Sequence, residues 1–244
     1  MIQLTLIQID NYGPWTTHPL PKREAYLQML QAEIYQTIQR MFSEKKALVF
    51  PMRYDNMMAI TNGLGEPEHK LIMDAINKKF PVSISMSIAA AETPYEAQAK
   101  ATKQLSTVGG AQHKHRKAIL KASGASNSPI KIAHVDINDI TKHTDSNVYD
   151  SYARVVQIER SLVKHFTPKG SLVFFMGGDN FLLPCGKTTK HDFLKIFKKI
   201  KKETSIALKA GIGTAKTAEE AVHLASMGLK EIRSGAKEEV IEKK

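Results

Sequence analysis

The sequence predicts an α+β protein made of two ferredoxin-like βαββαβ units in tandem, each with an antiparallel sheet and its helices on one face. Three blocks of the first half have similar counterparts in the second half. LTLIQIDNY is similar to IKIAHVDIN, LVFPMRYDNMMAITNG to LVFFMGGDNFLLPCG, and ISMSIAAAETPYEAQAKA to LKAGIGTAKTAEEAVHLA. Because the blocks keep their order and nearly their spacing, we interpret them as an internal duplication. We expect a first unit over residues 1–108, a flexible basic connecting segment over 109–129 and a second unit over 130–244.

Each half starts with an apolar, β-rich run that ends at an aspartate, which is Asp10 in the first half and Asp136 in the second. A long amphipathic helix should follow, because apolar residues recur at helical spacing over residues 26–41 and again over 155–163. These runs supply the first strand and the first helix of each predicted unit.

Each half continues with two short apolar runs joined by a tight turn that holds a second aspartate, Asp55 or Asp179. A shorter helix, a strand and a last helix complete the pattern, and Pro94 marks the first turn of the last helix in the first half. The glycines of the second turn, Gly177 and Gly178, allow positive φ angles and let an anion approach the backbone.

The composition predicts a folded, cytoplasmic protein with an anionic partner. Of the 244 residues, 42% are hydrophobic and 24% are charged; no apolar run is long enough to span a membrane, and an acidic residue follows the start too early for a signal peptide. The single cysteine, Cys185, excludes an internal disulfide and a Cys-x-x-Cys zinc site. The formal net charge of +11 suits a nucleotide or nucleic acid, although the lysines of residues 190–203 are also explained as the solvated face of a helix.

The strand-end and turn aspartates together predict a metal site. In a βαββαβ sheet the first strand lies beside the hairpin, so we expect Asp10 next to Asp55 and Asp136 next to Asp179. Two carboxylates this close repel each other unless a cation lies between them, and oxygen ligands without cysteine or histidine favour Mg²⁺ or Mn²⁺. The four aspartates are therefore our candidate catalytic and metal-ligating residues, with two Mg²⁺ ions expected in a site. Asp and Asn also occur in hairpin turns for backbone reasons alone, but that explanation covers only one of the two acids in each half.

Other polar residues are candidates for ligand binding, each with a plainer alternative. Asn56 and Asn180 could read a base edge or only close their turns. Trp15 could stack on a purine or serve in a core or lid. The stretch AQHKHRK follows a Gly-Gly pair and predicts a mobile basic loop that closes over a triphosphate, with Gln112 and Arg116 as its candidates.

The paired aspartates around a βαββαβ hairpin resemble those of the palm-type nucleotidyl cyclases and the GGDEF diguanylate cyclases. More closely, IQIDNYGPWT, FPMRYDNMMAITNG and FFMGGDNFLLP, in this order in a tandem chain, resemble archaeal GTP cyclohydrolase III over essentially the whole chain. The resemblance implies a Mg²⁺-dependent enzyme that opens the imidazole ring of GTP, keeps the formyl group and cleaves the triphosphate. The implied products are 2-amino-5-formylamino-6-(5-phosphoribosylamino)pyrimidin-4(3H)-one and two phosphates, for flavin and deazaflavin biosynthesis.

The matching blocks and the basic loop also provide the candidate substrate-binding residues. These are Asn11, Tyr12, Gly13, Asn56, Gly177, Gly178, Asn180, Gln112 and Arg116. Both halves keep their aspartates, so the sequence leaves open which half is active. The first half has Arg53 and Tyr54 where the second has two glycines, and Arg53 could supply charge to a phosphate instead.

Two other functions stay open from the sequence. A nucleotidyl or dinucleotide cyclase would use a ribose hydroxyl and release pyrophosphate, and a non-catalytic nucleotide- or RNA-binding regulator would suit the basic surface. The predicted strands lack the aromatic residues of an RNA-recognition motif, so nucleic acid is not the expected partner. Two such sheets leave edges for self-association, so we expect a homo-oligomer, which light scattering would test.

Overall fold

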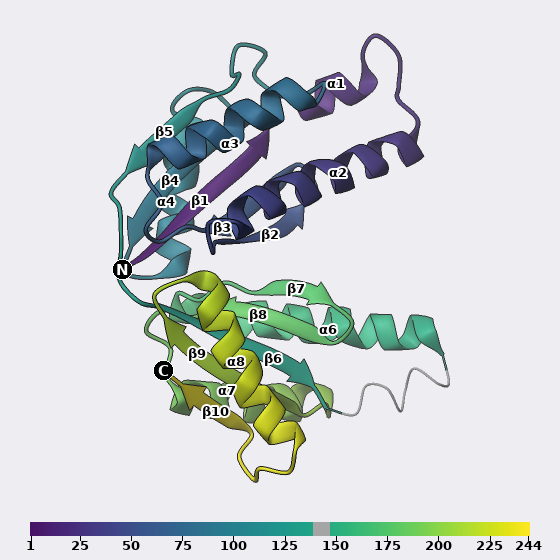
Figure 1. Ribbon diagram of the computed structural model, residues 1–244. Coiled ribbons are helices and arrows are strands. Elements are labelled where there is room, and N and C mark those ends of the chain that lie inside the picture. Colours follow the sequence, from purple (N-terminus) through teal and green to yellow (C-terminus); the bar gives the residue numbers. More distant parts are fainter. Residues whose placement is uncertain (139–146) are drawn as a thin grey trace. The chain divides into compact units, whose positions relative to one another are not determined.

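The computed structural model describes residues 1–138 and 147–244, and the chain divides into two compact units (Figure 1). The first unit contains Met1–Ala91 and Glu96–Ser128, and the second contains Glu92–Tyr95 and Pro129–Lys244. The segment 109–129, which we expected to be a connector, belongs to the first unit up to residue 128 and contributes a strand to its sheet.

The first unit has the predicted βαββαβ order, with a short helix inserted after the first strand and with one helix and one strand added at the end. Its elements are β1 (Ile2–Ile9), α1 (Tyr12–Thr17), α2 (Glu24–Ser43), β2 (Leu48–Arg53), β3 (Asn56–Ile60), α3 (Glu66–Lys79), β4 (Ile84–Ala91), α4 (Pro94–Ser106) and β5 (Leu120–Ser123). The strand order is β2-β3-β1-β4-β5, and all neighbours are antiparallel except β5, which runs parallel to β4. α4 begins at Pro94, as predicted.

The core of the first unit lies between its sheet and the helices α2 and α3. Ile7 and Ile9 of β1 face Ile34 and Ile38 of α2 and Ile72 of α3 in one buried cluster. Because side chains alternate along a strand, the even-numbered residues of β1 point to the other face of the sheet. This alternation decides where the polar residues at the end of β1 lie.

The second unit repeats this arrangement. Its described elements are β6 (Ile130–Ile137), α6 (Val148–Phe166), the 3-10 helix η1 (Thr167–Lys169), β7 (Phe174–Gly177), β8 (Asn180–Pro184), α7 (Lys190–Thr204), β9 (Leu208–Ala215), α8 (Ala218–Arg233) and β10 (Val240–Lys243). The strand order is β10-β9-β6-β8-β7, with β10 parallel to β9 and the other neighbours antiparallel. α6 and α7 cover one face through a core that includes Phe166, Phe193 and Phe197. The predicted α+β class, with ferredoxin-like units in tandem, is confirmed.

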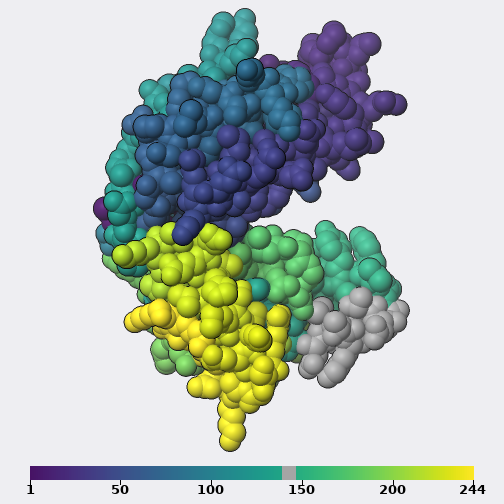
Figure 2. Space-filling model, in the orientation of Figure 1, coloured from purple at the N-terminus to yellow at the C-terminus, as the bar shows by residue number. Residues whose placement is uncertain are grey.

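The helix α8 lies on the opposite face of the second sheet and approaches β9 unusually closely. A Cβ atom added at Gly211 would lie 1.8 Å from the carbonyl oxygen of Ala225, and one at Gly213 would lie 2.0 Å from that of Ala221. Only glycine permits this approach, because any other residue would place a carbon inside the helix backbone. α8 crosses in front of the sheet in Figure 1, and its outer side is on the surface in Figure 2.

Within the described residues, no helix combines the length and the apolar character that crossing a membrane requires.

A buried polar network ties β1 to α3 in the first unit. His69 is fully buried, and its Nδ1 donates to the Gly65 carbonyl oxygen at 2.6 Å, so its Nε2 accepts from the Thr5 hydroxyl at 2.8 Å. The Thr5 hydroxyl oxygen in turn lies 2.9 Å from that of Thr61. Burial lowers the pKa of His69, so the folded unit holds this ring neutral.

This network predicts that acid destabilises the protein. The unfolded chain binds a proton at His69 more readily than the folded chain does, so the free energy of unfolding falls as the pH drops below about 6.5, by at most about 1.4 kcal/mol per pH unit. Urea unfolding of the wild type and of His69→Gln at pH 7.5 and pH 5 measures how much His69 contributes to this loss of unfolding free energy. An equal loss of stability in both proteins would contradict it.

Candidate functional site

The first unit holds a polar hollow of about 600 Å³ near the end of β1. It is lined by Gln8, Ile9, Tyr12, Gly13, Thr16, Gln31, Arg53, Tyr54, Asp55, Asn56, Ala111 and Gln112. Its volume falls within the range of small-molecule sites. The structure thus brings together the predicted site residues Tyr12, Gly13, Asp55, Asn56 and Gln112, from α1, the hairpin and the segment after α4.

The turn after β1 positions one wall of this hollow. Asn11 takes a left-handed conformation (φ 51°), which asparagine tolerates, and its N–H donates to the Ala111 carbonyl oxygen at 2.7 Å. The Tyr12 hydroxyl accepts from Gln31 Nε2 at 2.6 Å. Trp15 stacks on Tyr12 with ring centroids 6.0 Å apart and packs against the core, as the core alternative expects.

Asp55 lies at the tip of the first hairpin, and its carboxylate forms a salt bridge with Arg53. Arg53 Nη2 lies 2.5 Å from Asp55 Oδ2, and Arg53 Nε lies 3.0 Å from Oδ1. Partial burial acts to raise the pKa of Asp55, but the hydrogen bonds from Arg53 and Asn56 outweigh it and hold the pKa below its usual value. The carboxylate is therefore an anion at neutral pH.

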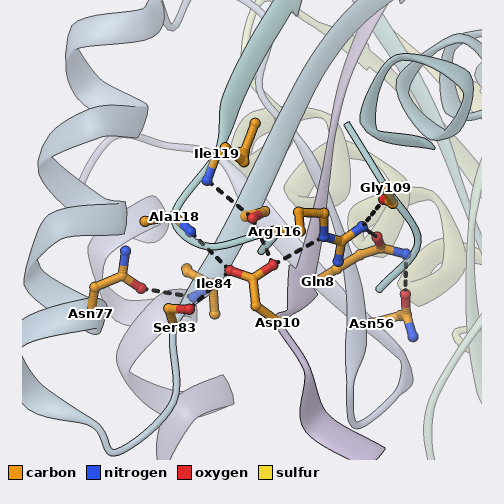
Figure 3. Close-up of polar contacts among 11 residues, drawn as sticks. Gln8, Asp10, Asn56, Asn77, Ser83, Ile84, Gly109, Arg116, Ala118 and Ile119 are labelled. Atoms are coloured by element: carbon orange, nitrogen blue, oxygen red, sulfur yellow. Dashed lines mark hydrogen bonds and ion pairs between the residues drawn. The ribbon is translucent and has the colours of Figure 1, made fainter. Parts of the chain in front are cut away.

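Asp10 lies on the other side of the strand end in a buried network (Figure 3). One carboxylate oxygen accepts from Ser85 Oγ at 2.7 Å and Arg116 Nε at 3.2 Å, and the other accepts from Ser83 Oγ and the Ala118 N–H, both at 3.0 Å. Four donors saturate the carboxylate. Asp10 lines a separate small hollow and not the one that holds Asp55, so the two acids that we expected side by side line different hollows.

Arg116 is held in the same network and not presented to solvent. Its residue is 2% exposed, and its Nη1 donates to Gln8 Oε1 at 3.0 Å and to the Gly109 carbonyl oxygen at 3.3 Å (Figure 3). Arg116 thus binds Asp10 and Gln8 at the end of β1, and its contact with a triphosphate stays a prediction. Gln112 and Arg116, neighbours in the predicted basic loop, thus line different hollows.

The sheet registers show that Asp10 and Asp136 do not occupy equivalent places. Gln8 faces Asn56 in the first sheet, whereas Asp136 faces Asn180 in the second. The counterpart of Asp136 is therefore Gln8. The sequence blocks were matched two residues out of register, because a shift by two keeps every side chain of a strand on the same face.

Backbone bonds at the hairpin tips confirm this register. The Ile9 N–H donates to the Asp55 carbonyl oxygen at 3.0 Å, and the Ile137 N–H donates to that of Asp179 at 3.3 Å. The residue after each isoleucine, Asp10 or Asn138, therefore lies beyond the last strand residue that bonds to the hairpin. Only the second unit therefore carries a carboxylate on the strand directly opposite the hairpin asparagine.

In the second unit Asp136 faces two cations. It is 2% exposed, its Oδ1 lies 3.0 Å from Lys209 Nζ, and its Oδ2 accepts from Arg233 of α8. Asp179 receives a hydrogen bond on Oδ1 from Asn180 Nδ2 at 2.8 Å, and among the described residues no donor reaches its Oδ2. Asn180 Oδ1 in turn lies 2.9 Å from Nε2 of His134, whose pKa is lowered by burial.

The two hairpin turns differ as their sequences predict. Gly177 and Gly178 have φ angles of 97° and 61°, and a Cβ atom at Gly177 would meet nothing within 4 Å. The expectation that these glycines provide positive φ angles is confirmed. The open backbone at Gly177 leaves room for an anion beside Asp179, whereas Arg53 and Tyr54 line the corresponding turn of the first unit.

The carboxylates differ in how well they would suit a metal ion. No group of three or more His, Cys, Asp or Glu side chains is assembled within residues 1–138 and 147–244. Mg²⁺ commonly needs only one or two protein carboxylates, with phosphate and water oxygens completing its coordination. Asp136 and Asp179 are the better candidates, because Asp136 pairs with Asn180, which follows Asp179 in the chain, and one oxygen of Asp179 is open. Asp10 does not fit, because its oxygens are saturated.

Sequence reasoning missed the polar residues that surround these acids. They are Gln8 and Gln31 in the first unit and His134, Lys209, Ser226 and Arg233 in the second. The one available signal was a polar side chain at an inner position of an otherwise apolar strand, as at Gln8 and His134.

Fold and site together define a class: a duplicated ferredoxin-like protein in which one unit carries one carboxylate on its first strand, opposite the hairpin asparagine, and a second in the open glycine turn of that hairpin. The chain belongs to the GTP cyclohydrolase III family, which matches residues 1–244. It is 47% identical over 238 residues to GTP cyclohydrolase III of Methanothermobacter thermautotrophicus, with 96% of each chain covered. It is 46% identical over 237 residues to that of Methanocaldococcus jannaschii, with 96% of this chain and 88% of the relative covered. Among solved structures, the active GGEEF domain of a diguanylate cyclase from Vibrio cholerae matches 48% of this chain and 84% of that chain, with 13% identity and a TM-score of 0.40.

Proposed function

We propose that this GTP cyclohydrolase opens the imidazole ring of GTP with retention of the formyl group and cleaves the triphosphate in a Mg²⁺-dependent reaction. The products would be 2-amino-5-formylamino-6-(5-phosphoribosylamino)pyrimidin-4(3H)-one and two phosphates. The observation that carries the proposal is the match of the whole chain to one family, with relatives of 43–47% identity that bear the name GTP cyclohydrolase III.

The second unit is our candidate for the catalytic metal site. Asp136 and Asp179 would hold Mg²⁺ together with phosphate oxygens of the substrate, and the open turn at Gly177 and Gly178 would admit the phosphates. A bound Mg²⁺ would polarise a phosphoryl oxygen and acidify a water molecule. Lys209 and Arg233 would balance the carboxylate charge and assist anion binding.

The first unit is our candidate for binding the purine base of GTP. Its hollow lacks a second carboxylate because Gln8 takes the place of Asp136, but it carries four side-chain amides, from Gln8, Gln31, Asn56 and Gln112. Each amide can both donate and accept, which suits a purine base. Burial raises the pKa of Tyr12, so its hydroxyl stays protonated at neutral pH.

The test is incubation of the purified protein with GTP and Mg²⁺, with the ultraviolet spectrum and phosphate release followed together. We expect loss of the purine spectrum with release of orthophosphate, and neither change after metal removal by EDTA. An intact purine with pyrophosphate release would indicate a cyclase instead. An intact purine without phosphate release would overturn the proposal in favour of a binding role.

A further inference from the structure

Four side chains of the second unit form an unbroken chain of hydrogen bonds that ends at Asp179. Ser226 Oγ lies 3.0 Å from His134 Nδ1, His134 Nε2 lies 2.9 Å from Asn180 Oδ1, and Asn180 Nδ2 lies 2.8 Å from Asp179 Oδ1. The chain starts on α8, crosses β6 and reaches the hairpin after β7. It therefore links a helix on one face of the sheet to the turn that holds the candidate metal ligand.

The chemistry of the four groups fixes the direction of every bond. A carboxylate only accepts, so Asn180 turns its NH₂ group to Asp179 and its oxygen to His134. The ring must then carry its proton on Nε2. The neutral ring accepts at Nδ1, and the Ser226 hydroxyl is the donor there.

The close packing of α8 on β9 brings Ser226 within reach of His134. Gly211 and Gly213 of β9 let the helix backbone approach the sheet nearly to contact, and Ser226 follows Ala225, whose carbonyl oxygen occupies the space of a Gly211 side chain. The helix that carries Ser226 also carries Arg233, the partner of Asp136. α8 thus contacts Asp136 directly and is linked to Asp179 through His134 and Asn180.

The duplication provides an internal comparison for His134. The register that matches Gln8 with Asp136 matches Leu6 with His134, and Leu6 is buried between Met58 and Ser87 of the neighbouring strands. The fold therefore accepts leucine at this place and does not require a histidine. The polar chain occurs in the unit that carries a carboxylate, Asp136, on the strand opposite the hairpin asparagine.

We propose that His134 is a positioning residue: held by Ser226, it turns the Asn180 amide so that Asp179 is fixed in the orientation needed to bind a divalent cation. This inference rests on the proposed metal site of the second unit. Side chains that orient a metal ligand through hydrogen bonds commonly contribute about 10- to 100-fold to metal affinity or activity.

The first test uses His134→Leu, which copies the residue of the first unit, and Ser226→Ala, which removes only the hydroxyl donor. We expect the Mn²⁺ affinity of the GTP-free protein, measured by electron paramagnetic resonance, to fall about 10-fold or more in His134→Leu and by less in Ser226→Ala. The matched controls are His223→Leu on the exposed side of α8 and Ser161→Ala on α6. Unchanged Mn²⁺ affinity in folded His134→Leu would overturn the proposal, and Ser226→Ala decides the matter if His134→Leu does not fold.

The second test asks whether Ser226 acts through His134. In a double-mutant cycle, Ser226→Ala should weaken Mn²⁺ binding in the wild-type background and have no further effect once His134 is leucine. Additive losses would contradict the chain of contacts. Because Mn²⁺ binding needs no turnover, a protein that binds Mn²⁺ in this pattern but leaves GTP intact would contradict only the proposed function.

Discussion

Replacement of Asp179 by asparagine is expected to lower kcat for GTP by about 100-fold or more, comparable to the loss of one preorganised electrostatic group in other active sites. The amide keeps the shape of the side chain and can still close the turn, so the fold should persist. What is lost is the charge of a carboxylate whose second oxygen is open to a cation. Steady-state kinetics at saturating Mg²⁺, with circular dichroism to verify folding, measures the effect.

Three further aspartate variants locate the site. Asp136→Asn should resemble Asp179→Asn, because Asp136 lies opposite Asn180, the residue that follows Asp179, and both acids are assigned to the same metal site. Asp55→Asn should change KM more than kcat, because the first unit has Gln8 in place of the second acid. Asp74→Asn, which breaks only an exposed i,i+4 pair with Lys70, is the control. A loss of kcat in Asp55→Asn with normal turnover in Asp179→Asn would move the metal site to the first unit.

Gly211→Ala is expected to destabilise the second unit by about 3 kcal/mol, at the upper end of the usual cost of overpacking. The new methyl group would lie 1.8 Å from the carbonyl oxygen of Ala225 and 2.6 Å from the backbone nitrogen of Leu229. Neither atom belongs to a flexible side chain, so α8 must move away from β9. Urea or thermal unfolding should show an earlier transition, and displacement of α8 should also reduce activity by withdrawing Ser226 and Arg233 from the site.

Gly110→Ala is the matched control for this change. A Cβ atom at Gly110 would meet nothing within 4 Å, and its φ angle is not positive, so its stability should remain close to that of the wild type. If Gly211→Ala had the same unfolding midpoint as Gly110→Ala and the wild type, the close packing of α8 on β9 would be wrong.

The repeat in the sequence was sufficient to predict the fold class, because hydrophobic periodicity and turn residues determine which elements form. It could not predict β5, since LKAS is short, largely exposed and lies in a polar stretch that gives no strand signal. It also could not place α8 against the glycines of β9. A glycine in a strand indicates a close neighbour but not which element that neighbour is.

The site was predicted less completely than the fold, for a reason visible at Asp10. A match between two strands of alternating residues is nearly as good after a shift by two, so sequence similarity paired Asp10 with Asp136. The strand ladders instead make Gln8 the counterpart of Asp136. The two units therefore differ chemically at the strand position opposite the hairpin asparagine. The aspartates of the turns, Asp55 and Asp179, were correctly matched because the hairpin fixes their register.

The position of β5 determines where this chain could be cut. A first half that stopped at residue 108 would lose the strand that covers β4, leaving a row of unpaired backbone N–H and C=O groups open to other chains. It would also lose Arg116, the ionic partner of buried Asp10, and Ser126, whose N–H binds the side chain of Gln3. A proteolytic nick or a split gene should therefore be tolerated close to residue 129, where the first unit ends and the second sequence repeat is about to begin.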